Sequence, residues 1–161
     1  IDAFCDFQRN NTINKKVTLK IIGYSLNPFS NEGSEMGNNM EGIEYLGRVS
    51  DKELIKLYQN AYAFIFPSFY EGFGIPPLEA QACGCPVLAS NQASIPEILR
   101  NSALYFNPFD KSEMTQVMIN IIENEELRNR LIKEGSENVN RFSWEESAKK
   151  LNLLARTLTK N

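Results

Sequence analysis

Glu71-Gly-Phe-Gly-Ile-Pro-Pro-Leu-Glu79 follows closely on an apolar run, Ala61-Tyr-Ala-Phe-Ile-Phe-Pro67. The apolar run predicts a buried strand, and the glycines predict a tight loop. The Pro-Pro pair suits the first turn of a helix, where the missing amide protons are not needed. A strand, a glycine-rich loop and a helix N-terminus in this order are how α/β proteins hold phosphates.

The two carboxylates of this segment, Glu71 and Glu79, add acceptors for hydroxyl groups. Each carboxylate accepts two donors at once, so a phosphate site beside them indicates a nucleotide-sugar. The residues alone leave a plainer alternative open. A strand-to-helix turn often contains Gly and Pro, and a Glu in a first helical turn is favourable for the helix dipole alone.

Segments typical of strands and helices alternate on both sides of this motif. We expect strands at residues 17–22, 43–46, 62–66, 86–89 and 103–106. We expect helices over residues 1–12, 51–60, 77–83, 95–99, 110–123 and 125–134, and from residue 143 onward. Residues 24–41 predict a loop with one weak helical turn near Glu35. The alternation predicts an α/β fold in one domain over residues 1–161, a Rossmann-like parallel sheet with helices on both faces.

The ends of the predicted helices carry recognisable signals. Capping boxes, in which Glu stands three residues after Ser or Asp, begin at Ser50, Asp110 and Ser143. Gly84 and Gly135 stand where glycine commonly ends a helix. We therefore place three helix starts and two helix ends at these residues.

The composition excludes several classes of function. A net charge of −3 with intermixed acidic and basic residues argues against a nucleic-acid partner. No apolar run reaches the roughly 20 residues of a transmembrane helix. The chain has no histidine, so no histidine base acts from within it. Three cysteines without a secretory signal predict reduced thiols in the cytoplasm, and Cys83-Gly-Cys85 reads as small apolar residues rather than a metal or redox pair.

The run Phe66-Pro-Ser-Phe-Tyr-Glu-Gly-Phe-Gly-Ile-Pro-Pro-Leu-Glu-Ala-Gln-Ala-Cys-Gly-Cys-Pro-Val-Leu-Ala-Ser90 resembles the donor-binding core of the group 1 glycosyltransferases, glycosyltransferase family 4. That core carries Glu-x7-Glu followed by Glu-Ala-x-Ala-x-Gly-x-Pro-Val. Tyr45-Leu-Gly-Arg-Val49, Pro96-Glu97 and Ala103-Leu-Tyr-Phe-Asn-Pro-Phe-Asp110 add further matches. The resemblance is good from about residue 43 to the C-terminus and weaker before it.

The resemblance implies one half of a GT-B fold, in which two Rossmann-like domains face each other across a cleft. This chain would be the C-terminal, nucleotide-sugar-binding domain, truncated at its N-terminal edge, and the N-terminal acceptor domain would lie outside it. Its first residue is Ile1 rather than Met, as expected of a fragment. The family's upstream Arg and Lys, which clamp the pyrophosphate, would precede Ile1.

The resemblance also implies roles for individual residues. Glu71 is the candidate catalytic residue, which positions the transferred sugar. Backbone groups of the following loop would help to hold the donor, namely those of Gly72, Phe73, Gly74 and Ile75. The amides near Leu78 would hold the diphosphate, and Glu79 the ribose.

Two further segments bear on the expected site. Gly47-Arg-Val49 would line the pocket for the base, although Arg48 is equally well explained as an exposed charge on a turn. Ala93-Ser94 stands where many relatives have Gly-Gly, which leaves the backbone contacts of that segment open.

The function implied is that of a retaining glycosyltransferase. It would move a hexose from a nucleotide-diphosphate sugar, of UDP or GDP type, to a hydroxyl acceptor, without a metal or other cofactor. The expected setting is polysaccharide, lipopolysaccharide or glycolipid synthesis in the cytoplasm, at the inner face of the membrane. The partners would be the chain's own N-terminal domain and a glycan or lipid-linked acceptor. The isolated fragment would be inactive.

Two other classes are weighed against this one. A non-catalytic GT-B subunit would bind a nucleotide-sugar without transferring it, and it would have no physical need for both Glu71 and Glu79. A nucleotide-binding oxidoreductase would carry Gly-x-Gly-x-x-Gly after its first strand, which Gly23-Tyr-Ser25 does not supply. The last predicted helix places Leu151, Leu154 and Leu158 on one face, which predicts an exposed apolar stripe and pairing in solution.

Overall fold

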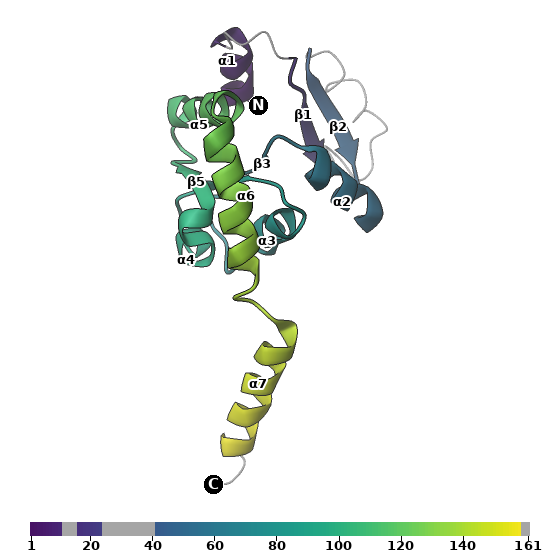
Figure 1. Cartoon of the computed structure of the whole chain (residues 1–161), viewed down its shortest axis with the longest axis vertical. Coiled ribbons are helices and arrows are strands. Elements are labelled where there is room, and N and C mark those ends of the chain that lie inside the picture. Colours follow the sequence, from purple (N-terminus) through teal and green to yellow (C-terminus); the bar gives the residue numbers. More distant parts are fainter. Residues whose placement is uncertain (11–15, 24–40, 159–161) are drawn as a thin grey trace.

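The computed structural model of the chain describes residues 1–10, 16–23 and 41–158 (Figure 1). The strands are β1 (Leu19–Ile22), β2 (Ile43–Gly47), β3 (Phe64–Phe66), β4 (Val87–Ser90) and β5 (Ala103–Phe106). The helices are α1 (Asp2–Asn10), α2 (Asp51–Asn60), α3 (Ile75–Ala82), α4 (Ile95–Leu99), α5 (Lys111–Glu123), α6 (Glu125–Val139) and α7 (Trp144–Leu158), with the 3₁₀ turn η2 (Arg100–Ser102). All five predicted strands are confirmed. The predicted loop over 24–41 lies outside the described residues apart from Glu41.

The strands pair in parallel throughout, as the alternation of strands and helices predicts. Among the described residues they form two sheets rather than one, with the orders β1-β2 and β3-β4-β5. In the larger sheet β4 lies between its two neighbours, with Val87 paired to Phe64 on one side and to Ala103 on the other. Because these strands are parallel, their carboxyl ends, and the loops that follow them, lie at one edge of the sheet.

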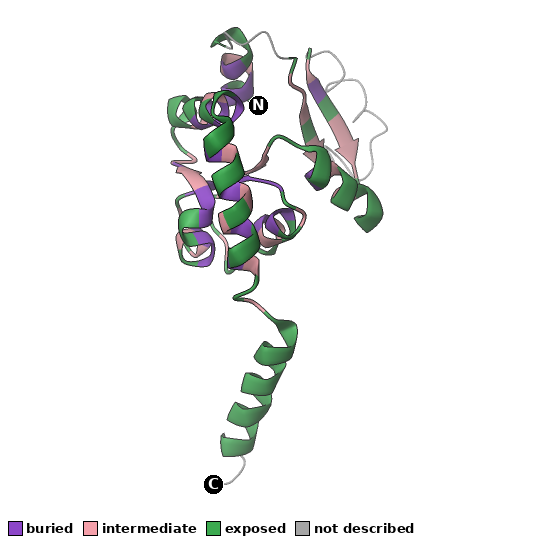
Figure 2. Ribbon diagram, in the orientation of Figure 1, coloured by how far each residue is buried: buried purple, intermediate pink, exposed green. Residues whose placement is uncertain are grey.

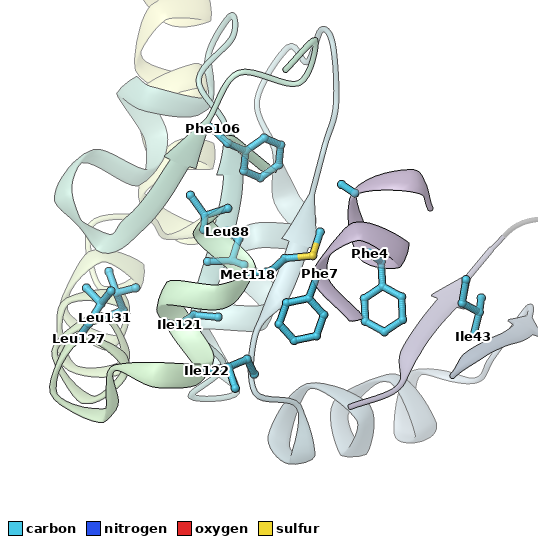
Figure 3. Packing of buried hydrophobic residues seen from close by; sticks show 12 residues of the cluster. Phe4, Phe7, Ile43, Leu88, Phe106, Met118, Ile121, Ile122, Leu127 and Leu131 are labelled. Carbon is cyan, nitrogen blue, oxygen red and sulfur yellow. The ribbon is translucent and has the colours of Figure 1, made fainter. Parts of the chain in front are cut away.

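The core on one side of the molecule joins α1 to α5 and α6 (Figure 3). Phe4 and Phe7 of α1 are buried with their ring centroids 5.6 Å apart. They belong to the same apolar cluster as Ile121 and Ile122 of α5. The hydroxyl of Thr115 donates to the carbonyl of Ala3 at 3.0 Å and ties the two helices together. The buried face of α1 thus packs against α5.

A second apolar cluster lies beneath α3 and α4. All four residues of β4 are buried, which is typical of a parallel strand covered on both faces. Ala80 of α3 and Ile95, Ile98 and Leu99 of α4 are buried in this cluster together with Val87. Burial of this apolar area stabilises the segment that carries the Glu71 motif.

Helix α3 ends at the predicted glycine. Gly84 has φ +76°, a backbone conformation that favours glycine. Its N–H donates to the carbonyl of Gln81, and the N–H of Cys85 donates to that of Ala80, which is the Schellman arrangement. Burial raises the pKa of the Cys85 thiol to about 12. Cys85 is therefore a neutral apolar residue, as predicted.

The predicted helix end at Gly135 is wrong, because α6 continues through this residue to Val139. Gly135 is buried, and a Cβ at this position would lie 3.0 Å from Cγ of Gln81. Gln81 is itself buried and joins three elements: its amide donates to the carbonyl of Ser102, and its carbonyl oxygen accepts from the amide of Asn138. The glycine therefore serves close packing of α6 against α3 rather than termination.

The three predicted capping boxes have different outcomes. At Ser50 the box is complete, since Ser50 and Glu53 exchange backbone-to-side-chain hydrogen bonds. Asp110 accepts from the N–H groups of Ser112 and Glu113. The Glu113 carboxylate, however, accepts from the N–H of Asn107 rather than from Asp110. At Ser143 the structure gives only the side-chain half, in which the hydroxyl accepts from Glu146.

Helix α7 projects away from the body of the molecule (Figure 2). Every residue of α7 whose side chain is described is exposed, including Leu151 and Leu154 of the predicted stripe. The side chain of Leu158 is outside the described set. No helix in the described parts of the chain is long and apolar enough to cross a membrane.

Candidate functional site

The loop that carries Glu71 starts at the carboxyl end of β3 and runs to Gly74 at the start of α3. A second loop, residues 91–94, starts at the carboxyl end of β4, which is the neighbouring strand. The structure brings these two loops together, because Ser94 donates to backbone carbonyls of the first loop. The candidate site therefore lies at the sheet edge where α/β proteins bind ligands.

The carboxylate of Glu71 has a defined orientation. The hydroxyl of Ser68 donates to Oε1 of Glu71 at 2.9 Å. The carbonyl of Glu71 accepts from the Ser94 hydroxyl at 2.7 Å. Glu71 is only half-buried, so its second oxygen remains able to accept hydroxyl groups from a ligand. Glu71 is thus held at both its backbone and its side chain.

Two features of the structure at Gly74, its backbone conformation and the closeness of Ile95, disfavour any residue with a side chain. Its backbone has φ 102° and ψ 59° at the N-cap of α3, a conformation that favours glycine. A Cβ at this position would lie 2.7 Å from Cδ1 of Ile95, which is buried. Gly72 lacks such a neighbour, since a Cβ there would meet nothing within 4 Å.

Helix α3 begins at Ile75 rather than at residue 77, so the two prolines are its second and third residues. In a regular helix with this start, the N–H of the fourth residue, Leu78, donates to the N-cap carbonyl. The prolines have no N–H. The amides left for a ligand at this helix end are therefore those of Gly74 and Ile75.

Glu79 lies in the second turn of α3 and not in the first, because the helix starts earlier than predicted. Its side chain is exposed and faces α2. Burial raises the pKa of Tyr58 in α2 to about 12, and the nearby charge of Glu79 adds to this rise. Glu79 thus lies near Tyr58, in the last turn of α2, and is not part of the N-terminus of α3.

The Gly47-Arg48-Val49 segment begins at the last residue of β2, in the smaller sheet. Gly47 has φ +60°, and its carbonyl accepts from the N–H of Gly23 at 2.7 Å. Arg48 is exposed and Val49 is half-buried. The segment leads into the first turn of α2, whereas Glu79 lies near Tyr58 in the last turn of the same helix.

Aromatic side chains surround the Glu71 loop. The ring of Phe73 packs edge-on against Phe142, with centroids 5.5 Å apart. Phe69 packs against Phe109, which follows β5, with centroids 4.9 Å apart, and Tyr70 is 81% exposed.

The described residues contain no group of three or more His, Cys, Asp or Glu side chains that could hold a metal ion.

Sequence reasoning missed two residues of the site, Ser68 and Ser94. Ser68 stands three residues before Glu71, a spacing at which a hydroxyl in a turn reaches a following side chain. Ser94 was noted only as a departure from Gly-Gly. Its partner is 23 residues away, so no local pattern reports the contact.

Comparison with known proteins now identifies the family. Residues 1–138 match the model of the family described as glycosyl transferases group 1. The chain belongs to the group 1 glycosyltransferases. It is 39% identical over 111 residues to the O-antigen chain mannosyltransferase B of Escherichia coli, covering 69% of this chain and 29% of that protein. It is 46% identical over 79 residues to the O-antigen chain mannosyltransferase RfbU of Salmonella typhimurium, covering 49% of this chain and 22% of that protein.

A solved structure agrees with this assignment. The chain superposes on a sucrose-phosphate synthase from Thermosynechococcus elongatus with a TM-score of 0.75 and 28% identity, covering 89% of this chain and 39% of that chain. This group 1 glycosyltransferase thus has the predicted fold class, a Rossmann-like half of a GT-B fold. It spans less than a third of the length of the two mannosyltransferases it matches.

Proposed function

We propose that this chain is the donor-binding domain of a retaining hexosyltransferase that uses a nucleotide-diphosphate sugar. The observation that carries the proposal is the Glu71 loop. A carboxylate oriented by Ser68 lies next to two glycines at the carboxyl edge of β3, in a chain that belongs to the group 1 glycosyltransferases. The geometry combines hydroxyl acceptors with backbone donors, which is what a sugar phosphate requires.

In this proposal Glu71 accepts hydrogen bonds from hydroxyl groups of the transferred sugar. Backbone amides of the loop Gly72-Phe73-Gly74 and of Ile75 hold the sugar and its phosphates. The dipole of α3 stabilises the negative charge that develops on the leaving diphosphate. The diphosphate contact is assigned to Gly74 and Ile75 in preference to Leu78, because of where α3 begins. The protein acts by placement and charge stabilisation, and the proposal requires no metal or other cofactor.

The nucleoside would lie toward the smaller sheet. Glu79 is exposed and faces α2, a position from which its carboxylate can accept both ribose hydroxyl groups. Gly47, Arg48 and Val49 precede α2 and would line the base. This arrangement places the sugar above β3 and the base beside β2.

We propose mannose as the sugar and a surface polysaccharide as the product. Two relatives with 39% and 46% identity are named O-antigen chain mannosyltransferases. The acceptor would be a glycan or lipid-linked hydroxyl, bound by an N-terminal domain outside this chain. The reaction would take place in the cytoplasm at the inner face of the membrane. On this view the isolated domain has no transferase activity, and measured turnover by the 161-residue chain alone would contradict the domain assignment.

Calorimetric titration tests the donor site. GDP and UDP are titrated into the full-length protein that carries this chain, and the titration is repeated with Glu79→Gln. Loss of one charge-assisted hydrogen bond to the ribose should weaken binding by roughly 1.5–3 kcal/mol. Unchanged affinity would remove the ribose role from Glu79. Tight binding of GDP-mannose without transfer to any acceptor would instead favour a non-catalytic subunit.

A further inference from the structure

We propose that Ser94 is a positioning residue for the donor site. Its hydroxyl holds the Glu71 loop so that the amide N–H groups of Gly72 and Gly74 point toward the ligand. The inference rests on the proposed function, because it assigns a role in binding the donor sugar to a residue outside the Glu-x7-Glu motif.

The contact consists of one hydroxyl and two carbonyls. Ser94 Oγ lies 2.7 Å from the carbonyl oxygen of Glu71 and 3.3 Å from that of Phe73. A hydroxyl has a single proton, so the donation is shared and is stronger to Glu71. Both carbonyls therefore point toward the start of α4.

Because the peptide bond is planar, the direction of each carbonyl fixes the direction of the N–H of the next residue. No peptide bond in the described residues is cis, so each C=O points opposite to the N–H of the next residue. Carbonyls of Glu71 and Phe73 that face Ser94 leave the N–H groups of Gly72 and Gly74 facing the other way. Within the described residues neither of these two amides has a hydrogen-bond acceptor. Gly72 is exposed, so its amide is open to a ligand, whereas Gly74 is buried.

The hydroxyl of Ser94 contacts the Glu71 loop in place of the helix-capping bond that a serine at this position ordinarily makes. Ser94 is the N-cap residue of α4, where a serine side chain ordinarily accepts from its own helix. Here it makes no such bond, and its hydroxyl donates to the Glu71 loop instead. The preceding Ala93 has φ +51°, a conformation that is uncommon for a residue with a side chain. The neighbouring Ile95 is buried and touches Gly74, so the loop meets α4 at a second point.

Three variants of the full-length protein test the proposal: Ser94→Val, Ser94→Thr and Ser94→Ala. Valine and threonine have nearly the same shape, and only threonine keeps the hydroxyl. We expect Ser94→Val and Ser94→Ala to lower kcat/KM for the donor sugar about tenfold or more, mainly through kcat. We expect Ser94→Thr to stay within about threefold of the wild type in kcat/KM. Because the Gly74 amide is assigned to the diphosphate, we expect the affinity for GDP and UDP to fall in Ser94→Val and Ser94→Ala and to stay within about twofold of the wild type in Ser94→Thr.

Each other outcome overturns the proposal. A Ser94→Val variant as active as the wild type would show that the hydroxyl positions nothing. If Ser94→Thr were as defective as Ser94→Val, the role would be one of general loop packing. If kcat/KM fell in Ser94→Val while the affinity for GDP and UDP stayed unchanged, the hydroxyl would not orient the Gly74 amide assigned to the diphosphate. A wild-type protein that binds neither GDP nor UDP would overturn the proposed function itself, and this inference with it.

Discussion

The two sheets of this molecule differ in how deeply their strands are buried. The three-stranded half, made of β3, β4, β5 and the helices α3 to α6, contains a strand whose four residues are all buried. The two-stranded half, made of β1, β2 and α2, has no buried residue in β1, and Ile43 is the one buried residue of β2. The Glu71 loop belongs to the first half and the Gly47–Val49 segment to the second. The proposed sugar site is therefore built on the more rigid support.

The comparison teaches where precision is needed. Placement of the reacting sugar must be accurate to a fraction of an ångström, whereas the base needs only to be held. The Glu71 loop is supported by buried Ile95, which lies against Gly74, and by the part-buried hydroxyl of Ser94. The proposed base side, at residues 47–49, has exposed Arg48 and is followed by the local cap of α2.

The largest expected difference between the halves concerns core truncation. Leu88→Ala removes a side chain that is 1% exposed from the centre of the larger sheet, and it should lower the free energy of unfolding by about 2–5 kcal/mol. Ile22→Ala in half-buried β1 should lower it by about 1 kcal/mol. Urea unfolding followed by circular dichroism measures both. Equal losses would contradict the comparison.

Two glycines allow a matched test of the loops. Gly74→Ala combines backbone strain with a clash, since its Cβ would lie only 2.7 Å from Cδ1 of Ile95, and it should destabilise the chain by roughly 2–5 kcal/mol. Gly47→Ala has the strain alone, because a Cβ there meets nothing within 4 Å, and it should lose about 1–2 kcal/mol. Thermal unfolding measures the loss of stability in both variants. A larger loss in Gly47→Ala than in Gly74→Ala would contradict the packing argument.

Alkaline pH should weaken contacts in both halves, because Cys85 and Tyr105 lie in the three-stranded half and Tyr58 lies in α2. Burial raises the pKa of Cys85 from 9.0, and those of Tyr58 and Tyr105 from 10.0, to about 12 in each case. The folded state therefore keeps these protons where the unfolded chain loses them. The stabilisation is complete below about pH 9 and is lost between about pH 9 and 12, by up to roughly 1.4 kcal/mol per pH unit for each group. Urea midpoints that stay constant from pH 8 to 11 would contradict this.

The smallest effect belongs to the cap of α2. Ser50→Ala removes one partner of a complete capping box in the two-stranded half and should destabilise the chain by about 1 kcal/mol. The change should leave the Glu71 loop intact. Hydrogen exchange of the α2 amides should rise, while exchange in α3 should stay the same. Equal acceleration in α3 would mean that the two halves unfold as one.

Local signals in the sequence predicted much of this fold. The α2 boundaries follow from Ser50, Glu53 and the apolar residues between the caps, all within a few positions of one another. Gly84 ends α3 for a reason that its own φ angle shows. These elements depend on nearby residues, and the sequence reports them directly.

Other features depend on distant residues and could not be predicted. Gly135 has the same local pattern as a helix-ending glycine, yet it is needed because Gln81 lies against it. The start of α3 depends on Gly74 packing beneath Ile95, which is 21 positions away, so the prolines alone misplaced it by two residues. The target of the Ser94 hydroxyl is likewise set by the pairing of β3 with β4.

The most direct test of the account compares two ligands in one variant. GDP-mannose and GDP are titrated calorimetrically into the full-length protein and into Glu71→Gln. The account predicts that Glu71→Gln weakens GDP-mannose by about tenfold or more and leaves GDP within about twofold, because Glu71 contacts only the sugar. Equal affinities of wild type and variant for GDP-mannose, or an equal loss for both ligands, would contradict the assignment of the Glu71 loop to the donor sugar.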